Sequence, residues 1–372
     1  MNGPIVITGG GTGGHVYPMQ AVAEQLQKLG VSAAQLRFVG SRRGQEATLL
    51  ASGPIALTLL PGRGVRRSLS LASLARNAVA VAGLASAAAV ALVKVGRWRP
   101  SVVVSVGGYA SFATSMAAVV WRRPLVLVEF DATPGLAQRI LARFAARRCT
   151  AFESNVPRGV TTGAPLREAI ATVDRSDAAR QVARLSATPP IDEQRSVVVI
   201  MTGSLGARRV NDAVSALAAL WSARADRTLV HVTGRRDFSH VSRARPDVTA
   251  LDYRIVDFAD MTQLWSICDV ALCRSGAITI AELTALAIPS VLVPLPGAPG
   301  DHQTRNAQAL ALAGGAKVIR DADLTAQTLA RALDETLVPS QLASMSRSAG
   351  SLGRRDAAQT IAREVVAVAG AR

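Results

Sequence analysis

A glycine-rich turn near the N-terminus contains the residues best suited to chemistry. The turn covers residues 9–14, which read Gly-Gly-Gly-Thr-Gly-Gly, and His15 follows it. An apolar stretch at residues 4–8 precedes the turn, and a helical pattern at residues 17–29 comes after it. Glycines let a ligand approach the backbone closely, and a helix N-terminus offers unpaired N–H groups and a positive dipole end. The turn therefore predicts a phosphate or diphosphate site.

His15 is a candidate general base, because a neutral imidazole can accept a proton from an attacking hydroxyl near neutral pH. The alternative role is that of a helix-start histidine that only bonds the backbone. The turn also satisfies a loose Gly-x-Gly-x-x-Gly pattern, which is typical of dinucleotide sites. Such a site expects an acidic residue at the end of the second strand, where this chain has Ser41 and Arg42. Arg42 would still suit a ribose that carries a phosphate.

A second glycine turn, at residues 107–111, also follows an apolar stretch and is expected at the same edge of the first sheet. Tyr109 in this turn is a candidate to bond an acceptor hydroxyl or phosphate, and packing at a domain edge is its competing interpretation. Glu129 ends the next predicted strand. It could hold His15 or an acceptor sugar, or it could be an ordinary surface carboxylate.

Three polar segments in the second half of the chain combine a turn with the start of a helix. Residues 202–207 form a glycine turn suited to phosphate, and residues 274–282 place backbone N–H groups at a helix start. Glu282 lies one turn into that helix, where it could accept two ribose hydroxyls or remain a solvated helix carboxylate. Residues 300–306 concentrate donors and acceptors that suit sugar hydroxyls, although such a cluster also makes a helix cap.

The elements that must position these residues alternate between short Val- and Ile-rich stretches and Ala- and Leu-rich stretches of helical length. This pattern predicts two doubly wound parallel-sheet α/β units, separated where residues 169–195 lose the strand pattern. The predicted strands are residues 4–8, 35–39, 55–60, 101–106 and 124–129, then 196–201, 228–233, 249–255, 270–273 and 290–294. Ligands of open α/β sheets bind beyond the carboxyl ends of the strands, so a cleft between the two units is the expected site.

Composition limits the classes of partner. The chain has 372 residues, enough for two domains, and a formal net charge of +16 from 42 Lys plus Arg against 26 Asp plus Glu. Such an excess favours anionic partners: a phosphate-bearing substrate, an anionic bilayer or nucleic acid. Nucleic acid ranks last, because the sequence has no zinc-binding spacing and only 4% aromatic residues for stacking bases.

Cysteine usage and targeting signals indicate where the protein resides. Cys149, Cys268 and Cys273 are odd in number and lack metal-ligand spacing, which predicts buried thiols in a reducing compartment. The first residues lack the basic region of a signal peptide, so none is expected. Residues 77–93 are nearly uncharged, but they are short for a membrane span and rich in Ala and Val. We predict a buried or membrane-surface helix there.

Six ordered segments together resemble the MurG family, the N-acetylglucosaminyltransferases that act on undecaprenyl-diphospho-muramoyl-pentapeptide in peptidoglycan synthesis. The segments are residues 9–18, 107–111, 163–167, 203–207, 274–282 and 302–307, which run nearly end to end. The resemblance implies a two-domain GT-B fold and UDP-N-acetylglucosamine as the donor, with no metal or other cofactor required. It also implies direct attack of the acceptor hydroxyl on the donor's anomeric carbon, with inversion of configuration.

The same resemblance implies roles for individual residues. His15 would deprotonate the acceptor hydroxyl, with Glu129 and Tyr109 as further catalytic residues. The acceptor diphosphate would be bound by Thr12, Gly13 and Gly14. The donor would be bound by Arg167, Ser204, Ala277, Ile278, Thr279, Glu282, Gln303, Asn306 and Phe258. Within this set Glu282 would take the ribose, and Gln303 with Asn306 the hydroxyls of N-acetylglucosamine.

The implied organisation is an N-terminal acceptor-binding and membrane-associating domain at residues 1–163, a UDP-sugar-binding domain at 164–345 and a C-terminal helix at 346–372. That helix is expected to pack back on the N-terminal domain. Residues 63–99 place arginines beside leucines and Trp98, as docking on a membrane surface requires. A core helix with a solvated basic face is the alternative. The protein would then be peripheral to the cytoplasmic face of the cell membrane, with other cell-wall synthesis proteins as further partners.

Four segments depart from the family pattern, and the changes at residues 164–167 and at Thr202 are expected to be tolerable. Where the family reads His-Glu-Gln-Asn-Ala, residues 128–132 read Val-Glu-Phe-Asp-Ala, and the loop at residues 256–261 is one residue short. The first change leaves the acceptor open, so a related GT-B transferase with another lipid or small-molecule acceptor is the second hypothesis. The third is a catalytically impaired homologue that binds the lipid precursor. The presence of Arg167, Glu282 and Asn306 argues against this third hypothesis.

Overall fold

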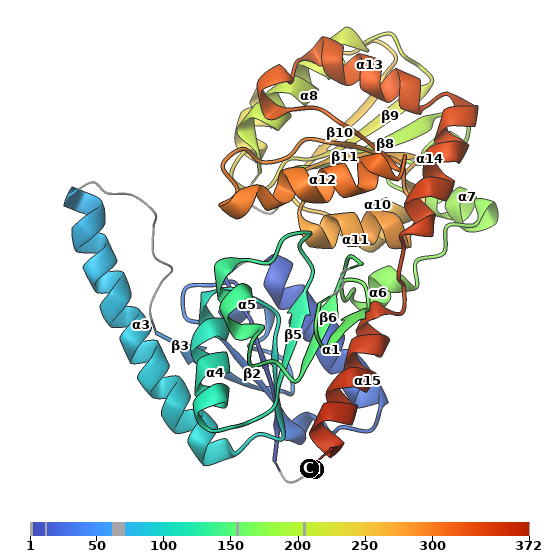
Figure 1. Cartoon of the computed structure of the whole chain (residues 1–372). Helices are drawn as coiled ribbons and strands as arrows, with labels where there is room; N and C mark the ends of the chain where they lie inside the picture. The colour runs from blue at the N-terminus through green and yellow to red at the C-terminus, as the bar shows by residue number, and fades with distance from the viewer. Residues whose placement is uncertain (1–2, 12, 62–70, 154–155, 204–205, 372) are drawn as a thin grey trace. The chain divides into compact units, whose positions relative to one another are not determined.

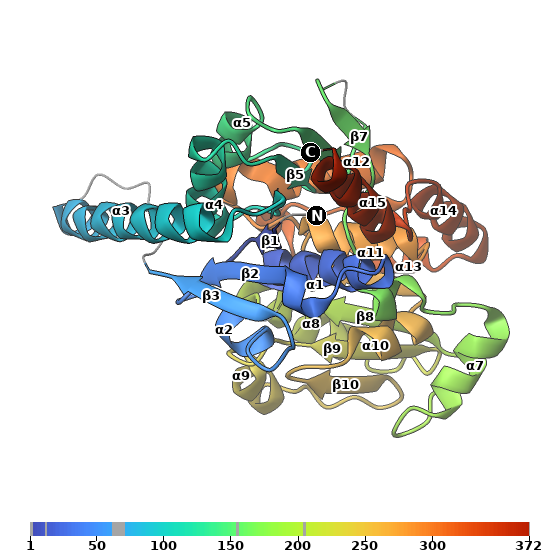
Figure 2. The same cartoon turned by 90° about the horizontal axis from the view of Figure 1, so that it is seen from below.

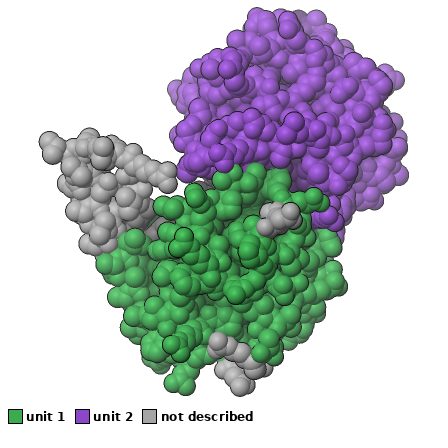
Figure 3. Space-filling model, in the orientation of Figure 1, with its two compact units in different colours: residues 1–168, 356–372 green, residues 169–355 purple. Residues whose placement is uncertain are grey.

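The chain folds into two compact α/β units (Figures 1 and 3). The computed structural model describes residues 3–11, 13–61, 71–153, 156–203 and 206–371, and at residues 71–82 and Tyr109 it describes the backbone alone. Unit 1 consists of residues 1–168 and 356–372, and unit 2 consists of residues 169–355.

The unit boundaries lie at different residues from the predicted domain boundaries. Residues 164–168 belong to unit 1, although the sequence analysis placed them in the second domain. One reason is that the Arg167 guanidinium stacks 4.2 Å from the ring centroid of Tyr17, in the first helix of unit 1. Residues 346–355 belong to unit 2, because residues 346–351 are the second half of α14 (Pro339–Ser351), which packs within that unit. The predicted C-terminal helix at 346–372 is therefore wrong in its start, since the last helix begins at Ala357.

Unit 1 is built on a parallel sheet with the strand order β3-β2-β1-β4-β5-β6-β7. The strands are β1 (Ile5–Thr8), β2 (Leu36–Ser41), β3 (Ala56–Leu60), β4 (Val102–Ser105), β5 (Leu125–Glu129), β6 (Arg147–Thr150) and β7 (Gly159–Thr161). Ile5 of β1 pairs with Leu36 on one side and Val102 on the other. The first five strands confirm the sequence prediction. It missed β6, which begins with two arginines, and the three-residue β7.

The helices of unit 1 flank this sheet and hold its turns. They are α1 (Gly13–Lys28), α2 (Glu46–Leu49), α3 (Leu71–Trp98), α4 (Tyr109–Val120), α5 (Leu136–Leu141) and α15 (Ala357–Gly370), with a 3-10 turn at Ala33–Gln35. α3 packs on α4, where Ala91 and Ala117 are buried in one core with Val103. α15 packs on α1 (Figure 2). The starts of α1 and α4 are thereby fixed beside the carboxyl ends of β1 and β4.

Unit 2 repeats the architecture with a parallel sheet in the order β10-β9-β8-β11-β12-β13. Its strands are β8 (Ser196–Met201), β9 (Arg227–Val232), β10 (Asp252–Val256), β11 (Val270–Cys273), β12 (Ser290–Leu292) and β13 (Ala316–Val318). The prediction of a second doubly wound sheet is confirmed, although the three-residue β13 was missed. In its core, Ile200 and Leu272 of the sheet are buried with Leu217 and Leu333 of the covering helices.

The helices of unit 2 include α7 (Asp177–Leu185), α8 (Arg208–Leu220), α9 (Phe238–Arg243), α10 (Met261–Ile267), α11 (Ala277–Ala285), α12 (His302–Leu312), α13 (Ala326–Thr336) and α14. The short α6 (Glu168–Ala171) spans the unit boundary, and 3-10 turns lie at Pro299–Asp301 and Asp321–Asp323. α8 starts directly after the turn that follows β8, and α11 follows β11 in the same way.

Two further findings concern the cysteines and the hydrophobicity of the helices. Cys149, Cys268 and Cys273 are free and buried, as expected. Within the described ranges, no helix has the length and hydrophobicity that a membrane crossing requires.

Candidate functional site

The two glycine turns of unit 1 pack directly against each other. Gly108 adopts φ 86° and ψ 169°, a backbone region that essentially only glycine occupies. A β-carbon at this position would overlap the carbonyl oxygen of Gly10. Ser111 Oγ donates to the carbonyl oxygen of Gly108 at 2.7 Å and holds the second turn in place. The turn after β4 therefore rests on the turn after β1 because residue 108 has no side chain.

His15 lies in the first turn of α1, half-buried beside the second glycine turn. A β-carbon on Gly107 would be 3.1 Å from His15 Nε2, so the imidazole edge lies directly over that glycine. The Phe130 ring packs against the imidazole with a centroid separation of 5.5 Å. Phe130 follows β5, so three neighbouring strand ends fix the position of the imidazole. The sequence analysis expected the turn at residues 107–111 at the same sheet edge as the first glycine turn, and the position of His15 agrees with this.

Glu129 is buried and paired with an arginine, which excludes only the surface-carboxylate interpretation. Its carboxylate is only 5% exposed and accepts from Arg148 Nη2 at 2.9 Å to Oε2 and 3.2 Å to Oε1. Glu129 is therefore not a surface carboxylate, and Arg148 of β6 is the partner that the structure records for it. A buried carboxylate needs such a bidentate guanidinium partner to offset its lost hydration.

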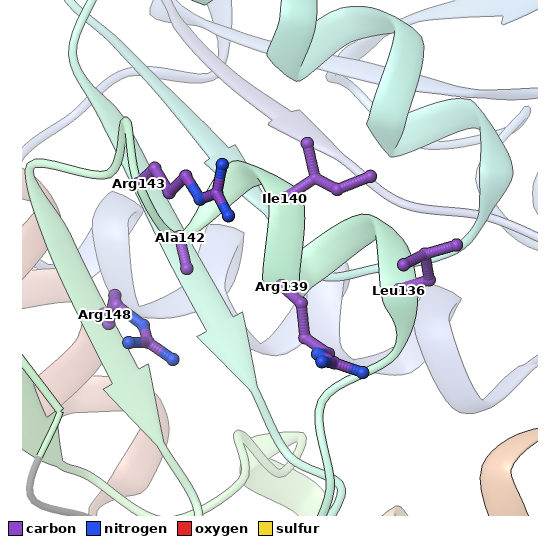
Figure 4. Close-up of a pocket in the computed structure, with 6 residues that line it drawn as sticks. All are labelled: Leu136, Arg139, Ile140, Ala142, Arg143 and Arg148. Atoms are coloured by element: carbon purple, nitrogen blue, oxygen red, sulfur yellow. The ribbon is translucent and has the colours of Figure 1, made fainter.

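Arg148 also lines a surface cavity of about 430 Å³ (Figure 4). Its lining consists of Leu136, Arg139, Ile140, Ala142, Arg143 and Arg148. Three arginines and two large aliphatic side chains therefore surround one hollow on unit 1, mostly from α5 and the turn after it. The sequence analysis did not identify this surface.

Gln138 is a second polar residue near His15 that the sequence analysis missed. It projects from α5, donates from Nε2 to the carbonyl oxygen of Val128 at 3.2 Å, and lies close to Gly107. A glutamine inside a helix carries no sequence signal for this placement, since nothing in the pattern relates α5 to the turn after β4.

Glu46 holds the first glycine turn through hydrogen bonds to its backbone. Its side chain is fully buried, and Oε1 accepts the N–H of Gly11 at 2.8 Å and that of Ser41 at 3.2 Å. β-Carbons on Gly10 or Gly44 would overlap its carboxylate. Glu46 thus occupies the N–H of Gly11 and holds the turn that leads into α1. A dinucleotide site would require an acidic residue near Ser41 or Arg42. The acidic residue found close by is Glu46, which bonds the glycine turn.

Replacing Glu46 with alanine is expected to lower the free energy of unfolding by about 2 to 4 kcal/mol. The change removes the shared acceptor of two backbone N–H groups and leaves a cavity under the turn. Urea unfolding measures the loss, with the exposed Glu153→Ala as the matched control. Equal stability of the two variants would contradict a loop-holding role for Glu46.

The glycine turn after β8 in unit 2 rests on a buried aspartate. Asp237 is fully buried and accepts from Arg208 at 3.0 Å, Arg236 at 3.1 Å and Asn211 at 3.1 Å. Burial alone would raise the pKa of Asp237, but the hydrogen bonds and charges of Arg236 and Arg208 outweigh it and lower the pKa. Arg236 also donates to the carbonyl oxygen of Gly206 at 3.1 Å. The turn therefore carries two arginines at its base.

This aspartate belongs to a longer buried chain of polar groups. Asn211 Oδ1 meets His231 Nε2 at 2.9 Å, and His231 Nδ1 meets the Tyr253 hydroxyl at 2.9 Å. Burial lowers the pKa of His231 to about 3, so this imidazole stays neutral near neutral pH. His231 is therefore a structural residue that supports the turn from the core of unit 2. Ser204 in the turn, like Thr12 in unit 1, lies outside the described residues.

The start of α11 combines unpaired backbone donors with a held carboxylate. Gly276 precedes the helix without a side-chain cap, so the N–H groups of Ala277, Ile278 and Thr279 face the turn. Glu282 follows within the same helix, and its Oε2 accepts the indole N–H of Trp265 at 2.9 Å. Glu282 is half-buried, so a purely solvated helix carboxylate does not describe it.

The structure joins the polar cluster at the start of α12 to the turn before α11. Ser275 Oγ donates to the carbonyl oxygen of Gln303 at 2.8 Å, and the fully buried Asn306 donates to the carbonyl oxygen of Ser275 at 3.3 Å. Gln303 Oε1 accepts the N–H of Leu295 at 3.0 Å. Phe258 is 57% exposed, and the Arg235 guanidinium lies 5.3 Å from its ring centroid.

The predicted site residues thus fall into two groups. Unit 1 holds His15, Gly13, Gly14, Glu129 and Arg167, although Arg167 was predicted in the donor domain. The described donor-site candidates of unit 2 are Ala277, Ile278, Thr279, Glu282, Gln303, Asn306 and Phe258. In the described part of the chain, no group of three His, Cys, Asp or Glu side chains is arranged to bind a metal ion.

Comparison with known proteins relates both units to glycosyltransferases. Residues 5–150 match the glycosyltransferase family 28 N-terminal domain, and residues 197–361 match the family 28 C-terminal domain. A curated relative from Alkalilimnicola ehrlichii, a UDP-N-acetylglucosamine–N-acetylmuramyl-(pentapeptide) pyrophosphoryl-undecaprenol N-acetylglucosamine transferase, is 38% identical over 98% of both chains. A transferase of the same name from Symbiobacterium thermophilum is 37% identical over 98% of this chain and 96% of its own.

Solved structures give the same relationship. MurG from Acinetobacter baumannii superposes with a TM-score of 0.75 at 27% identity, covering 98% of this chain and 99% of that one. The calicheamicin glycosyltransferase CalG4 has a TM-score of 0.69 at 14% identity over 100% of this chain and 99% of its own, which relates it by fold.

Proposed function

Because the chain belongs to the MurG family of glycosyltransferases, we propose that it transfers N-acetylglucosamine from UDP-N-acetylglucosamine to undecaprenyl-diphospho-N-acetylmuramoyl-pentapeptide. The observation that carries the proposal within the fold is the position of His15. Its imidazole lies over Gly107, where two glycine turns meet at the strand ends of unit 1. A base beside a phosphate-binding turn is what activation of a hydroxyl on a diphosphate-linked sugar requires.

In the proposed reaction, His15 accepts the proton of the acceptor hydroxyl while the hydroxyl oxygen bonds to the donor's anomeric carbon. The bond from that carbon to the UDP oxygen breaks, UDP leaves as an anion, and the configuration inverts. Fixed donors that face the developing charge are the expected main source of rate acceleration. The N–H groups of Ala277, Ile278 and Thr279, together with Arg167 and Ser204, are the proposed donors.

The remaining contacts divide by substrate. Glu282 is proposed to accept the ribose hydroxyls, with Gln303 and Asn306 on N-acetylglucosamine and Phe258 on the nucleobase side. Thr12, Gly13, Gly14 and Tyr109 are proposed to meet the acceptor diphosphate. Glu129 is neutralised by Arg148, so its proposed part is to fix the end of β5, from which Phe130 packs on His15. No metal or cofactor has a step in this scheme.

A transfer assay tests the proposal. Labelled UDP-N-acetylglucosamine is supplied with a lipid I analogue that has a soluble tail, with and without EDTA. We expect labelled disaccharide product under both conditions. Product only without EDTA would contradict the metal-free scheme.

A different acceptor is the second candidate function, and the observation that favours it is Phe130. Its ring stands against His15 in a segment where the family has a polar residue. If the protein binds UDP-N-acetylglucosamine but leaves the lipid I analogue unchanged, this second function gains support and residues 128–131 become the segment to restore.

We also propose that unit 1 docks on the anionic cytoplasmic face of the cell membrane. The side chains of residues 63–82 lie outside the described residues, and Trp98 packs partly against the core beside Arg37. The described support for docking comes from α5 and the turn after it. There Leu136, Ile140 and Phe144 are 60%, 40% and 49% exposed at four-residue spacing. The exposed Arg139 and Arg143 accompany them, a combination suited to an anionic lipid surface.

Replacing Leu136, Ile140 and Phe144 together by glutamine is expected to weaken binding to phosphatidylglycerol-containing vesicles by about tenfold or more. The reason is the loss of three apolar side chains that would enter the interface, and vesicle co-sedimentation measures it. The control replaces Val182 and Leu185, exposed apolar residues of α7 in unit 2, by glutamine. Unchanged vesicle binding by the triple variant would exclude α5 from the docking surface.

A further inference from the structure

Trp265 makes a specific polar contact in addition to filling the core of unit 2. It lies in the last turn of α10, its side chain is fully buried, and its Nε1 donates to Oε2 of Glu282 at 2.9 Å. An indole has one donor and no acceptor, so the proton in this bond comes from the tryptophan. Hydrogen bonds to a carboxylate are about twice as strong as neutral ones. The bond therefore restrains the orientation of the Glu282 carboxylate.

The position of Trp265 is set independently of Glu282. Asp260 caps the start of α10 by accepting the N–H of Thr262 at 2.9 Å. At the other end, Arg175 donates to the carbonyl oxygens of Trp265 and Cys268. The short helix is thus fastened at both ends, and the indole is held in place before any ligand binds.

We propose that Trp265 is a positioning residue for the nucleotide, holding Glu282 so that its carboxylate can accept the ribose hydroxyls. The inference rests on the proposed function, in which Glu282 binds the ribose. A carboxylate has about four acceptor positions, so the indole N–H by itself does not prevent it from binding a hydroxyl. α10 begins three residues after Phe258, so one clamped helix links the proposed nucleobase contact to the ribose contact.

The substitution Trp265→Phe tests this role, because phenylalanine keeps an aromatic ring and removes the indole donor. Calorimetry on the full chain compares UDP with 2′-deoxy-UDP and 3′-deoxy-UDP. The unaltered protein is expected to bind UDP about tenfold more tightly than at least one deoxy analogue. Trp265→Phe is expected to bind UDP about tenfold more weakly than the unaltered protein does. Its preference for UDP over that deoxy analogue is expected to fall below about threefold.

Trp221→Phe is the matched control. Trp221 is buried in the core of the same unit, at the end of α8, and it is not the tryptophan that bonds Glu282. It is expected to lose stability but to keep the full preference for UDP over the deoxy analogue. If Trp265→Phe also keeps that preference, its weaker binding is structural and the inference is wrong. If the unaltered protein binds UDP without preferring it over either analogue, the inference fails but the proposed transferase function stands. Failure of the unaltered protein to bind UDP overturns both.

A second measurement covers the case in which Trp265→Phe does not fold. The chain has four tryptophans, so replacing Trp98, Trp121 and Trp221 by phenylalanine leaves one indole N–H signal in an ¹⁵N spectrum. That signal is expected to shift on addition of UDP and to shift less with the deoxy analogue that binds weakly. An indole signal that both nucleotides shift equally, or that neither shifts, would overturn the proposal.

Discussion

Replacing His15 with alanine is expected to reduce the transfer rate by about 10² to 10⁴, the range that loss of a general base produces. The imidazole lies at the meeting point of two glycine turns, and alanine leaves no group there to accept the hydroxyl proton. The transfer assay with the lipid I analogue measures the rate. The affinity for UDP, measured by calorimetry, is expected to change little, because the proposed ribose contact Glu282 and nucleobase contact Phe258 belong to unit 2.

His240→Ala is a suitable control for this experiment. His240 lies on α9 of unit 2, where its Nε2 meets Asp212 Oδ1 at 3.0 Å, and it has no place in the proposed reaction. A His15→Ala variant as active as His240→Ala would show that another group accepts the proton. It would return His15 to the alternative role of a helix-start histidine.

Replacing Gly108 with alanine is expected to have the second large effect, on stability and on transfer together. Alanine is strained at φ 86° and ψ 169°, and its β-carbon would overlap the Gly10 carbonyl oxygen. Strain and overlap together should lower the free energy of unfolding by about 2 to 4 kcal/mol. The two turns must also separate, which moves Gly107 away from His15. Urea unfolding and the transfer assay measure the two consequences.

Gly135→Ala is the matched control in unit 1. Gly135 precedes α5 at φ −64°, an ordinary value for any residue, and a β-carbon there would meet nothing within 4 Å. This variant should be as stable and as active as the unaltered protein. If Gly108→Ala behaves in the same way, the contact between the two glycine turns is not required for transfer.

Much of the fold could be predicted because parallel strands that are buried on both faces form uninterrupted apolar stretches. β1, β4 and β8 were identified in this way. The prediction failed at β6, whose first two residues are arginines, and at β13, which has three residues. Such strands are held by their neighbours in the sheet, and this contribution is absent from local sequence.

The residues of the candidate site also divide into those that the sequence could predict and those that it could not. The glycine turns could be identified because their chemistry lies in contiguous residues. Glu46, Arg148 and Trp265 could not, because each has a decisive partner at least seventeen positions away in sequence: Gly11, Glu129 and Glu282 respectively. Pairings of this kind depend on how strands and helices are brought together. The sequence identified Glu282, and only the fold supplied its partner.

The chain path has a consequence for biosynthesis. Unit 2 is one continuous segment, whereas unit 1 is interrupted by it and recovers its last helix, α15, at residues 357–370. Ile361, Ala362 and Val365 of this helix are buried against unit 1. During translation the ribosome produces α15 only after all of unit 2, and domains generally fold as they emerge. Unit 2 can therefore complete its core on the ribosome, while the unit whose synthesis begins first is the last to be finished.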